Sequence, residues 1–170
     1  MKTSQKEYNE LLYVIDDPNN SNGNTYYRIP SDEPVYEINL DTRTVEVPEF
    51  LSVLDDHNAE VVWFKVDRFF DDVDLFGATC WIEYRNAVGE DYVTVAFPKV
   101  IKESNHDMLY IPWPICGPAT KAAGNVTFSF RFFKVGENKK TYFSINTVPA
   151  TSKILHGLKV NPDDFIEDDG

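Results

Sequence analysis

The sequence predicts an all-β fold, an antiparallel β-sandwich of the immunoglobulin or jelly-roll kind with an N-terminal arm. The first observation is the stretch 124–135, where Val126, Phe128, Phe130 and Phe132 take every second position, as in a strand with one buried face. The second is that shorter alternating segments, separated by turn residues, recur between positions 35 and 146. The third is composition, since 170 residues with 42% hydrophobic content suffice for one domain with a substantial core. The stretch 124–135 is expected mid-sheet, because a one-residue slip would expose its phenylalanines.

Three segments divide the chain. Residues 1–34 form the arm, with a patch from Tyr8 to Ile15 that is a helical turn or a strand, followed by the turn-forming run DDPNNSNGNT. Residues 35–158 form the sandwich, and residues 159–170 form an acidic tail. Two interpretations of the arm stay open, a loosely packed terminus and a segment that docks onto a neighbouring subunit.

The sandwich is expected to begin with a hairpin. Tyr36, Ile38 and Leu40 alternate, a turn follows, and the short strand TVEV ends at Pro48. Residues 49–58 are interpreted as a linker.

The next strand is expected at 60–67. Val62, Phe64 and Val66 lie on one face of it and Trp63 on the other. Trp63 is therefore exposed, partly buried within the chain or covered by another chain, and we favour partial burial over cover by another chain.

A second hairpin follows a solvated acidic turn. The turn contains Asp71, Asp72 and Asp74 but lacks the glycine and the distal glutamate of a calcium loop. The hairpin then pairs 78–86 with 91–101 across the AVGE turn.

Prolines shape the approach to the central strand. Pro112, Pro114 and Pro118 donate no backbone hydrogen bond, so this stretch should run extended at an edge or between sheets. One helical turn ending at Gly124 is expected next.

Two elements should complete the domain. Residues 141–147 alternate as a last strand after a GENKK hairpin loop. Residues 148–158 are expected to be short and at most helical, with Leu155 and Leu158 covering one end of the core.

No motif indicates catalysis, so we expect no enzyme, no catalytic residue, no cofactor and no metal site. His57, His106 and His156 fall in predicted loops, and phosphate-binding glycine loops, HExxH and CxxC are absent from the sequence. Cys80 and Cys116 are interpreted as small buried side chains.

Charge and hydropathy exclude further classes. The net charge is −12, from 28 acidic and 16 scattered basic residues, which argues against a nucleic-acid partner. Apolar runs fall short of the ~20 residues of a membrane helix, so no membrane partner is expected. The start MKTSQKEYNELLYVIDD lacks the apolar centre of a secretory signal, and folding in a cytoplasm is expected.

Aromatic side chains are the candidate interface residues. Stacked on sugar CH groups, they would make a carbohydrate-binding module, although core filling accounts for them equally well. The interface candidates are Trp63, Trp81, Tyr26 and Tyr110, and Trp113 joins them in the proposed sugar platform.

The order of several phrases resembles the N-terminal domain of upper baseplate proteins from tailed phages of Gram-positive bacteria. The resemblance covers most of residues 35–158, and the succession is more specific than any single phrase. The phrases are YEINLDTRTVEVPEFLSVL, DHNAEVVWFKVDRFFDDVDL, IEYRNAVGE, IPWPICGPATKAAGNVTFSFRFF and TYFSINTVPATSKILHGL.

This resemblance implies a structural protein of the virion, assembled in the host cytoplasm. It implies a baseplate or tail adaptor that connects the particle to peripheral, host-facing parts, with other virion proteins as partners and several copies per particle. The matching polar residues at strand ends are expected to hold loops by hydrogen bonds rather than to bind a partner. These residues are His57, Asn58, Asp67, Arg68, Asp71 and Asp74.

A second virion role stays open beside the first. Longer family members continue past this domain into a receptor-side region, so the domain alone is compatible with attachment elsewhere on the particle. A capsid decoration, a head-fibre base or a neck component would be such a use, and the carbohydrate-binding module is the third alternative.

Overall fold

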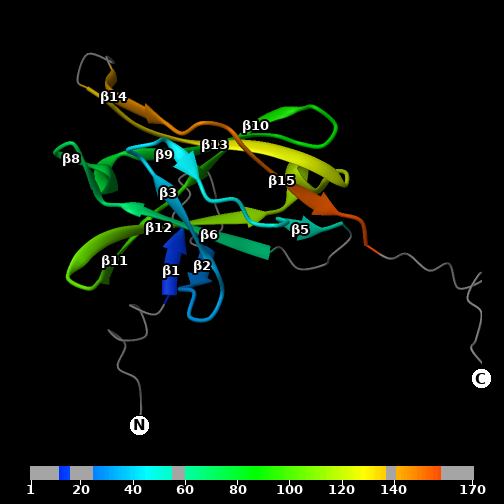
Figure 1. The fold of residues 1–170 in the computed structure, drawn as a ribbon, viewed down its shortest axis with the longest axis horizontal. Coiled ribbons are helices and arrows are strands. Elements are labelled where there is room, and N and C mark those ends of the chain that lie inside the picture. The colour runs from blue at the N-terminus through cyan, green and yellow to red at the C-terminus, as the bar shows by residue number, and fades with distance from the viewer. Residues whose placement is uncertain (1–11, 16–24, 55–59, 137–140, 158–170) are drawn as a thin grey trace, which may run out of the picture.

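The computed structural model describes residues 12–15, 25–54, 60–136 and 141–157. These residues are mostly β, which confirms the all-β prediction, and helix is limited in them to the 3₁₀ turns η1 (Leu75–Gly77) and η2 (Gly117–Thr120). Two larger sheets contain most of the strands, and Figure 1 shows β9, β10 and β13 above β6, β11 and β12.

The larger sheet has six strands among the described residues, and its centre is β13. β13 pairs with β9 on one side and with both β15 and β14 on the other, so the mid-sheet prediction is confirmed. In order across the sheet the strands are β10 (Asp91–Ala96), β9 (Thr79–Arg85), β13 (Gly124–Val135), β15 (Ala150–Leu155) and β5 (Ser52–Val53), with β14 (Thr141–Asn146) beside the far end of β13.

The second sheet has five strands, again counted over the described part of the chain. It contains the first predicted hairpin, formed by β3 and β4, and the strand predicted at 60–67, which is β6. In order they are β11 (Lys99–Glu103), β12 (His106–Ile115), β6 (Glu60–Asp67), β3 (Val35–Asn39) and β4 (Thr44–Val45).

Two short hairpins complete the described strands. β1 (Leu12–Ile15) pairs with β2 (Thr25–Arg28), so the patch ending at Ile15 contains a strand rather than a helical turn. β7 (Phe69–Phe70) pairs with β8 (Val73–Asp74) across the predicted acidic turn, where Asp71 and Asp72 have φ of 46° and 67°. The GENKK loop, Leu158 and the tail 159–170 lie wholly or mostly outside the described residues.

The inner faces of the two larger sheets meet in one core. Val126, Phe128, Phe130 and Phe132 are at most 1% exposed. The ring of Phe64 in β6 lies 4.8 Å from that of Phe130 and 5.8 Å from that of Phe128, centroid to centroid. The alternation read from β13 therefore defines the inner wall of this core.

Pairing is not antiparallel throughout. β3 runs parallel to β6, and β15 runs parallel to β5. Both parallel pairs join strands from distant parts of the chain, whereas the sequence pattern indicates only local hairpins.

Two segments predicted to lack strands contain them. Residues 150–155 form β15 instead of a helical turn, because Ser152 and Ile154 are buried while their neighbours face outward, a period of two. The linker 49–58 contains β5, and Leu51 beside it is fully buried.

The second predicted hairpin divides between the sheets. β9 and β10 pair as expected, but the chain leaves β10 at Ala96 and Pro98 separates it from β11 in the other sheet. A proline that lacks a donor favours a strand boundary at this point.

The prolines before the central strand lie inside β12. Pro112 and Pro114 pair with β6 on one side, while β11 reaches only to Tyr110 on the other. This half of β12 is thus a local edge, which agrees with the predicted edge position. The following turn, η2, ends at Thr120, and Gly124 begins β13 with φ of 133° rather than capping a helix.

Candidate functional site

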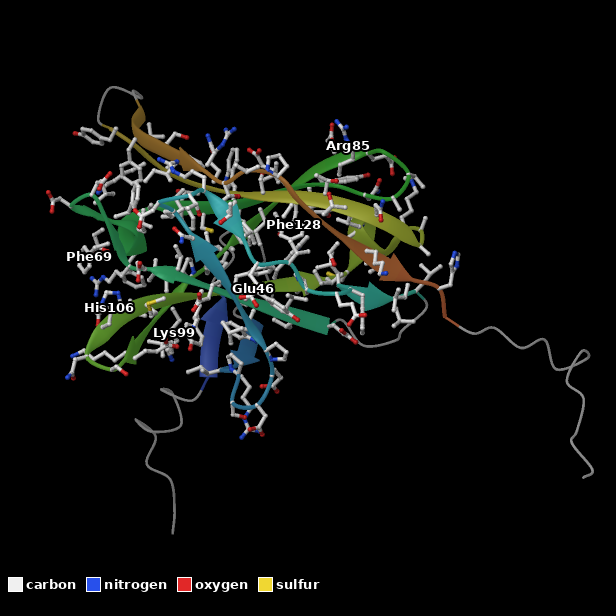
Figure 2. The ribbon with its side chains drawn as sticks, viewed as in Figure 1. Glu46, Phe69, Arg85, Lys99, His106 and Phe128 are labelled. Atoms are coloured by element: carbon white, nitrogen blue, oxygen red, sulfur yellow. The ribbon has the colours of Figure 1, made fainter. Side chains whose placement is uncertain are left out.

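The candidate site is the face of the six-stranded sheet that points away from the core, called here the outer face. It comprises the alternate residues of three neighbouring strands, in register across the sheet. They are Asp91, Val93 and Val95 of β10, Trp81, Glu83 and Arg85 of β9, and Thr127, Ser129, Arg131 and Phe133 of β13. Figure 2 shows Arg85 on the opposite side of the sheet from Phe128, which points into the core.

Charges on the outer face are held in pairs. Arg85 donates to both carboxylate oxygens of Asp91, at 2.8 and 3.1 Å, and these bonds lower the pKa of Asp91. Arg131 lies 3.3 Å from Glu83 and donates to Asn146 Oδ1 at 2.9 Å. Such pairs fix the side chains more than they stabilise the fold, because exposed ion pairs contribute little.

Apolar groups are exposed between these pairs. Val93 and Val95 are 51% and 48% exposed. The rings of Trp81 and Phe133 meet edge to face with centroids 4.7 Å apart. The outer face therefore alternates paired charges with apolar surface.

One hollow lies on the outer face and a second lies beside it. The larger, of about 590 Å³, lies between Arg85, Asp91, Val93, Ser129 and Pro149 and has both polar and apolar walls. The smaller, of about 340 Å³, is mainly apolar and lies at the end of β10. It is lined by Phe76, Ala78, Thr79, Cys80, Val95, Ala96, Phe97 and Pro98.

The structure does not bring the predicted aromatic platform together. Trp81 lies on the outer face, whereas Trp113 is buried in the core and Trp63 and Tyr110 belong to the five-stranded sheet. Tyr26 is in β2, and its side chain is outside the described part of the structure.

Trp63 is not an exposed residue. It is 4% exposed within this chain alone, and its ring lies 6.5 Å from that of Tyr110. Burial within the chain, the favoured interpretation of Trp63, is therefore the outcome, and it is more complete than expected, whereas exposure and cover by another chain are not what the structure shows. Cys116 is likewise exposed rather than buried, whereas Cys80 is buried as predicted.

A polar row crosses the outward side of the five-stranded sheet. The Tyr110 hydroxyl donates to Glu103, and Lys65 Nζ lies 3.2 Å from Glu103 and 3.8 Å from Glu37. Burial and the bond to Glu103 raise the pKa of Tyr110 to about 12, and the pKa of Glu103 is lowered by the Tyr110 bond. Lys65, Glu37 and Glu103 were not identified from the sequence, because only the register of β11, β12, β6 and β3 aligns them.

Arg68 fixes the acidic turn by hydrogen bonds, which is the role expected for the polar residues at strand ends. It donates to both oxygens of Asp74 at 3.0 Å and to Asp107 at 3.1 Å. Its guanidinium carbon also lies 5.1 Å from the ring centre of Phe69 and 5.5 Å from that of Phe76. These contacts occupy the guanidinium from several sides, so it serves the loop.

The two described histidines belong to different sheets, His106 at the start of β12 and His156 directly after β15. His106 begins β12 and bonds Asp67 at 2.7 Å, and His57 lies outside the described residues. Within the described residues, no three His, Cys, Asp or Glu side chains gather as metal ligands. None of the helices in that same part of the chain has the length and apolarity needed to cross a membrane.

Comparison with known proteins gives no relative. No family model matches the sequence, and no curated protein matches it. The resemblance to upper baseplate proteins therefore stays a prediction.

Proposed function

We propose that this chain is a non-enzymatic structural protein of a tailed-phage virion, a baseplate or tail adaptor that attaches peripheral, host-facing parts to the particle. The proposal rests on the positions, in the structure, of the sequence phrases that resemble upper baseplate proteins. They build β3 to β6, β9, β12, β13, β14 and β15, which are the frame of both larger sheets. The segments that resemble the family thus form most of the two sheets. The outer face of the six-stranded sheet is the surface that we propose for a partner.

The finer fold belongs to the same proposal. We infer a β-sandwich of the immunoglobulin or jelly-roll kind, with 35–158 as one domain behind an N-terminal arm. The contacts of Phe64 with Phe128 and Phe130 support it, because they join the inner faces of two sheets across one core.

The composition of the outer face supports a protein partner. Its valines and the Trp81–Phe133 pair offer apolar area, and its charges are already neutralised within the chain. A protein interface needs an apolar centre with few unpaired charges. The partners proposed are other virion proteins, present in several copies, and a net charge of −12 disfavours nucleic acid.

Immunogold labelling of purified particles tests this function. The antibody is raised against the chain, and antibody pre-absorbed with the purified protein serves as the control. Label at the tail tip or baseplate is expected, whereas label on the head or neck would favour the capsid or neck attachment alternative. Absence of the chain from purified virions would refute both.

A further inference from the structure

We propose that β10 is a self-association edge, at which two copies of this chain pair antiparallel about a two-fold axis. β10 ends the strand order of its sheet and pairs only with β9 among the described strands. An unprotected edge strand presents free backbone donors and acceptors to another chain. The inference concerns the outer edge of the sheet and does not depend on the virion function.

The other edges of the two larger sheets, over the described residues, carry protection that β10 lacks. β4 and β5 have two residues each, and β11 contains two lysines and a glutamate. The pairing of β14 is interrupted by a register shift between Lys134 and Val135. Short length, lysine and irregular pairing are devices that block edge-to-edge association.

β10 itself reads DYVTVA, without lysine, proline or glycine. Its one charge, Asp91, is engaged by Arg85 of the same chain at 2.8 Å. Both valines of the strand are about half exposed, at 51% and 48%. β-branched and aromatic residues favour the extended conformation, so the strand is ready to accept a neighbour.

A tight hairpin holds the strand in place. Asn86 bonds Glu90 through backbone and side chain, and Gly89 takes φ of 87° in the turn. Lys121 adds an ion pair to Glu90 at 2.9 Å. Little ordering of β10 is then needed on association, which lowers the entropic cost of binding.

The sequence of the strand favours a second copy as the occupant. In a continuous sheet, residues directly opposite one another point to the same face. A two-fold axis through Thr94 sets Val93 of each copy against Val95 of the other on the outer face. On the inner side it sets Tyr92 against Ala96 and Thr94 against itself. Asp91 of each copy faces Phe97 of the other, so no like charges lie opposite each other. The two Val93–Val95 pairs place four valines in one apolar stripe.

Net charge predicts how the dimer responds to salt. Each copy carries −12, so two copies repel at long range. Salt screens this repulsion over a Debye length that falls from about 30 Å at 0.01 M to about 8 Å at 0.15 M. The dimer should therefore tighten as salt is added, the opposite of an assembly held by ion pairs.

Sedimentation velocity over a concentration series tests the proposal. The wild-type chain should be a weak dimer, with a Kd on the order of 10–100 µM, since a single strand pair is a small interface. Val93→Lys with Val95→Lys should abolish the dimer, because lysines would face lysines across the axis. Val148→Lys is the matched control, since Val148 is 54% exposed and outside β10, and it should dimerise like the wild type.

The register is tested by a second double variant. Val93→Lys with Val95→Glu sets opposite charges against each other across the axis, so it should still dimerise where the double lysine variant does not, and loss of the dimer in this variant too would overturn the register. Circular dichroism of each variant checks that the fold is kept.

A disulfide trap gives an independent measurement. Thr94→Cys in a Cys116→Ser background should crosslink on mild oxidation, because Thr94 faces itself, whereas Val148→Cys should not. A wild-type chain that stays monomeric at the highest concentration would overturn the proposal. An unperturbed dimer in the double lysine variant, or equal loss in Val148→Lys, would overturn it as well.

Discussion

At the scale of single residues, Tyr110 links pH to stability. Its hydroxyl donates to Glu103, and burial with this bond raises its pKa to about 12. An unfolded tyrosine titrates near ~10. Because the folded pKa is the higher one, the stabilisation is complete below about pH 10 and is lost as pH rises through about 12.

Tyr110→Phe should therefore lower the free energy of unfolding at neutral pH. Between about pH 10 and 12 the variant should lose less stability than the wild type, because the group that titrates is gone. Urea unfolding at a series of alkaline pH values measures this. Tyr142→Phe is the control, since Tyr142 is 69% exposed. Equal alkaline slopes for Tyr110→Phe and the wild type would contradict the assignment.

Asp74 gives the corresponding effect in acid. The hydrogen bonds from Arg68, with a further one from the Phe76 amide, lower its pKa. A lowered folded pKa means stability that is present above the unfolded value of ~4 and lost as pH falls through the folded value. Asp74→Asn should be less stable at pH 7 and lose less on acidification than the wild type. Urea unfolding midpoints measured at a series of acidic pH values test this difference. Asp72→Asn, on the same turn, is the control and should behave like the wild type.

At the scale of elements, β13 carries the core through one of its faces. Phe130 is fully buried against the other sheet, with its ring centroid 4.8 Å from that of Phe64. Phe130→Ala should cost ~3–5 kcal/mol, because the transfer free energy of the ring is lost and a cavity is left in its place. Phe133→Ala, on the outer face of the same strand, should cost clearly less. Urea unfolding of the two variants compares the faces, and similar losses would mean that β13 does not present one face to the core.

The alternation in β13 was visible in the sequence because the period of a strand is local. The same holds for β6, for the hairpins β3–β4 and β9–β10, and for the turn at Asp71 and Asp72. β5 is not predicted from the sequence because its two residues pair in parallel with the distant β15, and β15 is not predicted because its alternation is short and its pairing with β13 and β5 is not encoded locally. Pairing with strands that are distant in the sequence therefore determines that β5 and β15 are extended.

The candidate site also contains residues that the local sequence pattern predicts and residues whose position depends on the tertiary fold. Trp81 was named, and it lies on the outer face, but Trp63 has an identical period-two signal and is buried. Alternation separates the two faces of a strand without telling which of them the rest of the chain covers. The hollow beside Pro149 is not predicted either, because it depends on where the β14–β15 connection runs beside β13.

At the scale of the whole molecule, the core is distinct from the outer face, whose side chains point away from it. The interior is continuous across the two larger sheets, and the charges beside Trp81 are paired within the chain. Partner binding at the outer face should then be separable from folding, since interface aromatics contribute strongly to binding when they are truncated.

Trp81→Ala should keep the fold and lose attachment to the particle. The indole meets Phe133 at 4.7 Å on the outer face, and an aromatic interface anchor typically costs 2 kcal/mol or more when removed, roughly a thirtyfold loss of affinity. Quantitative immunoblotting of virions assembled with the variant measures its copy number. Phe69→Ala, an aromatic 55% exposed in β7 outside that face, is the matched control and should assemble normally. A folded Trp81→Ala variant that is incorporated at the wild-type level would exclude the outer face as the attachment surface.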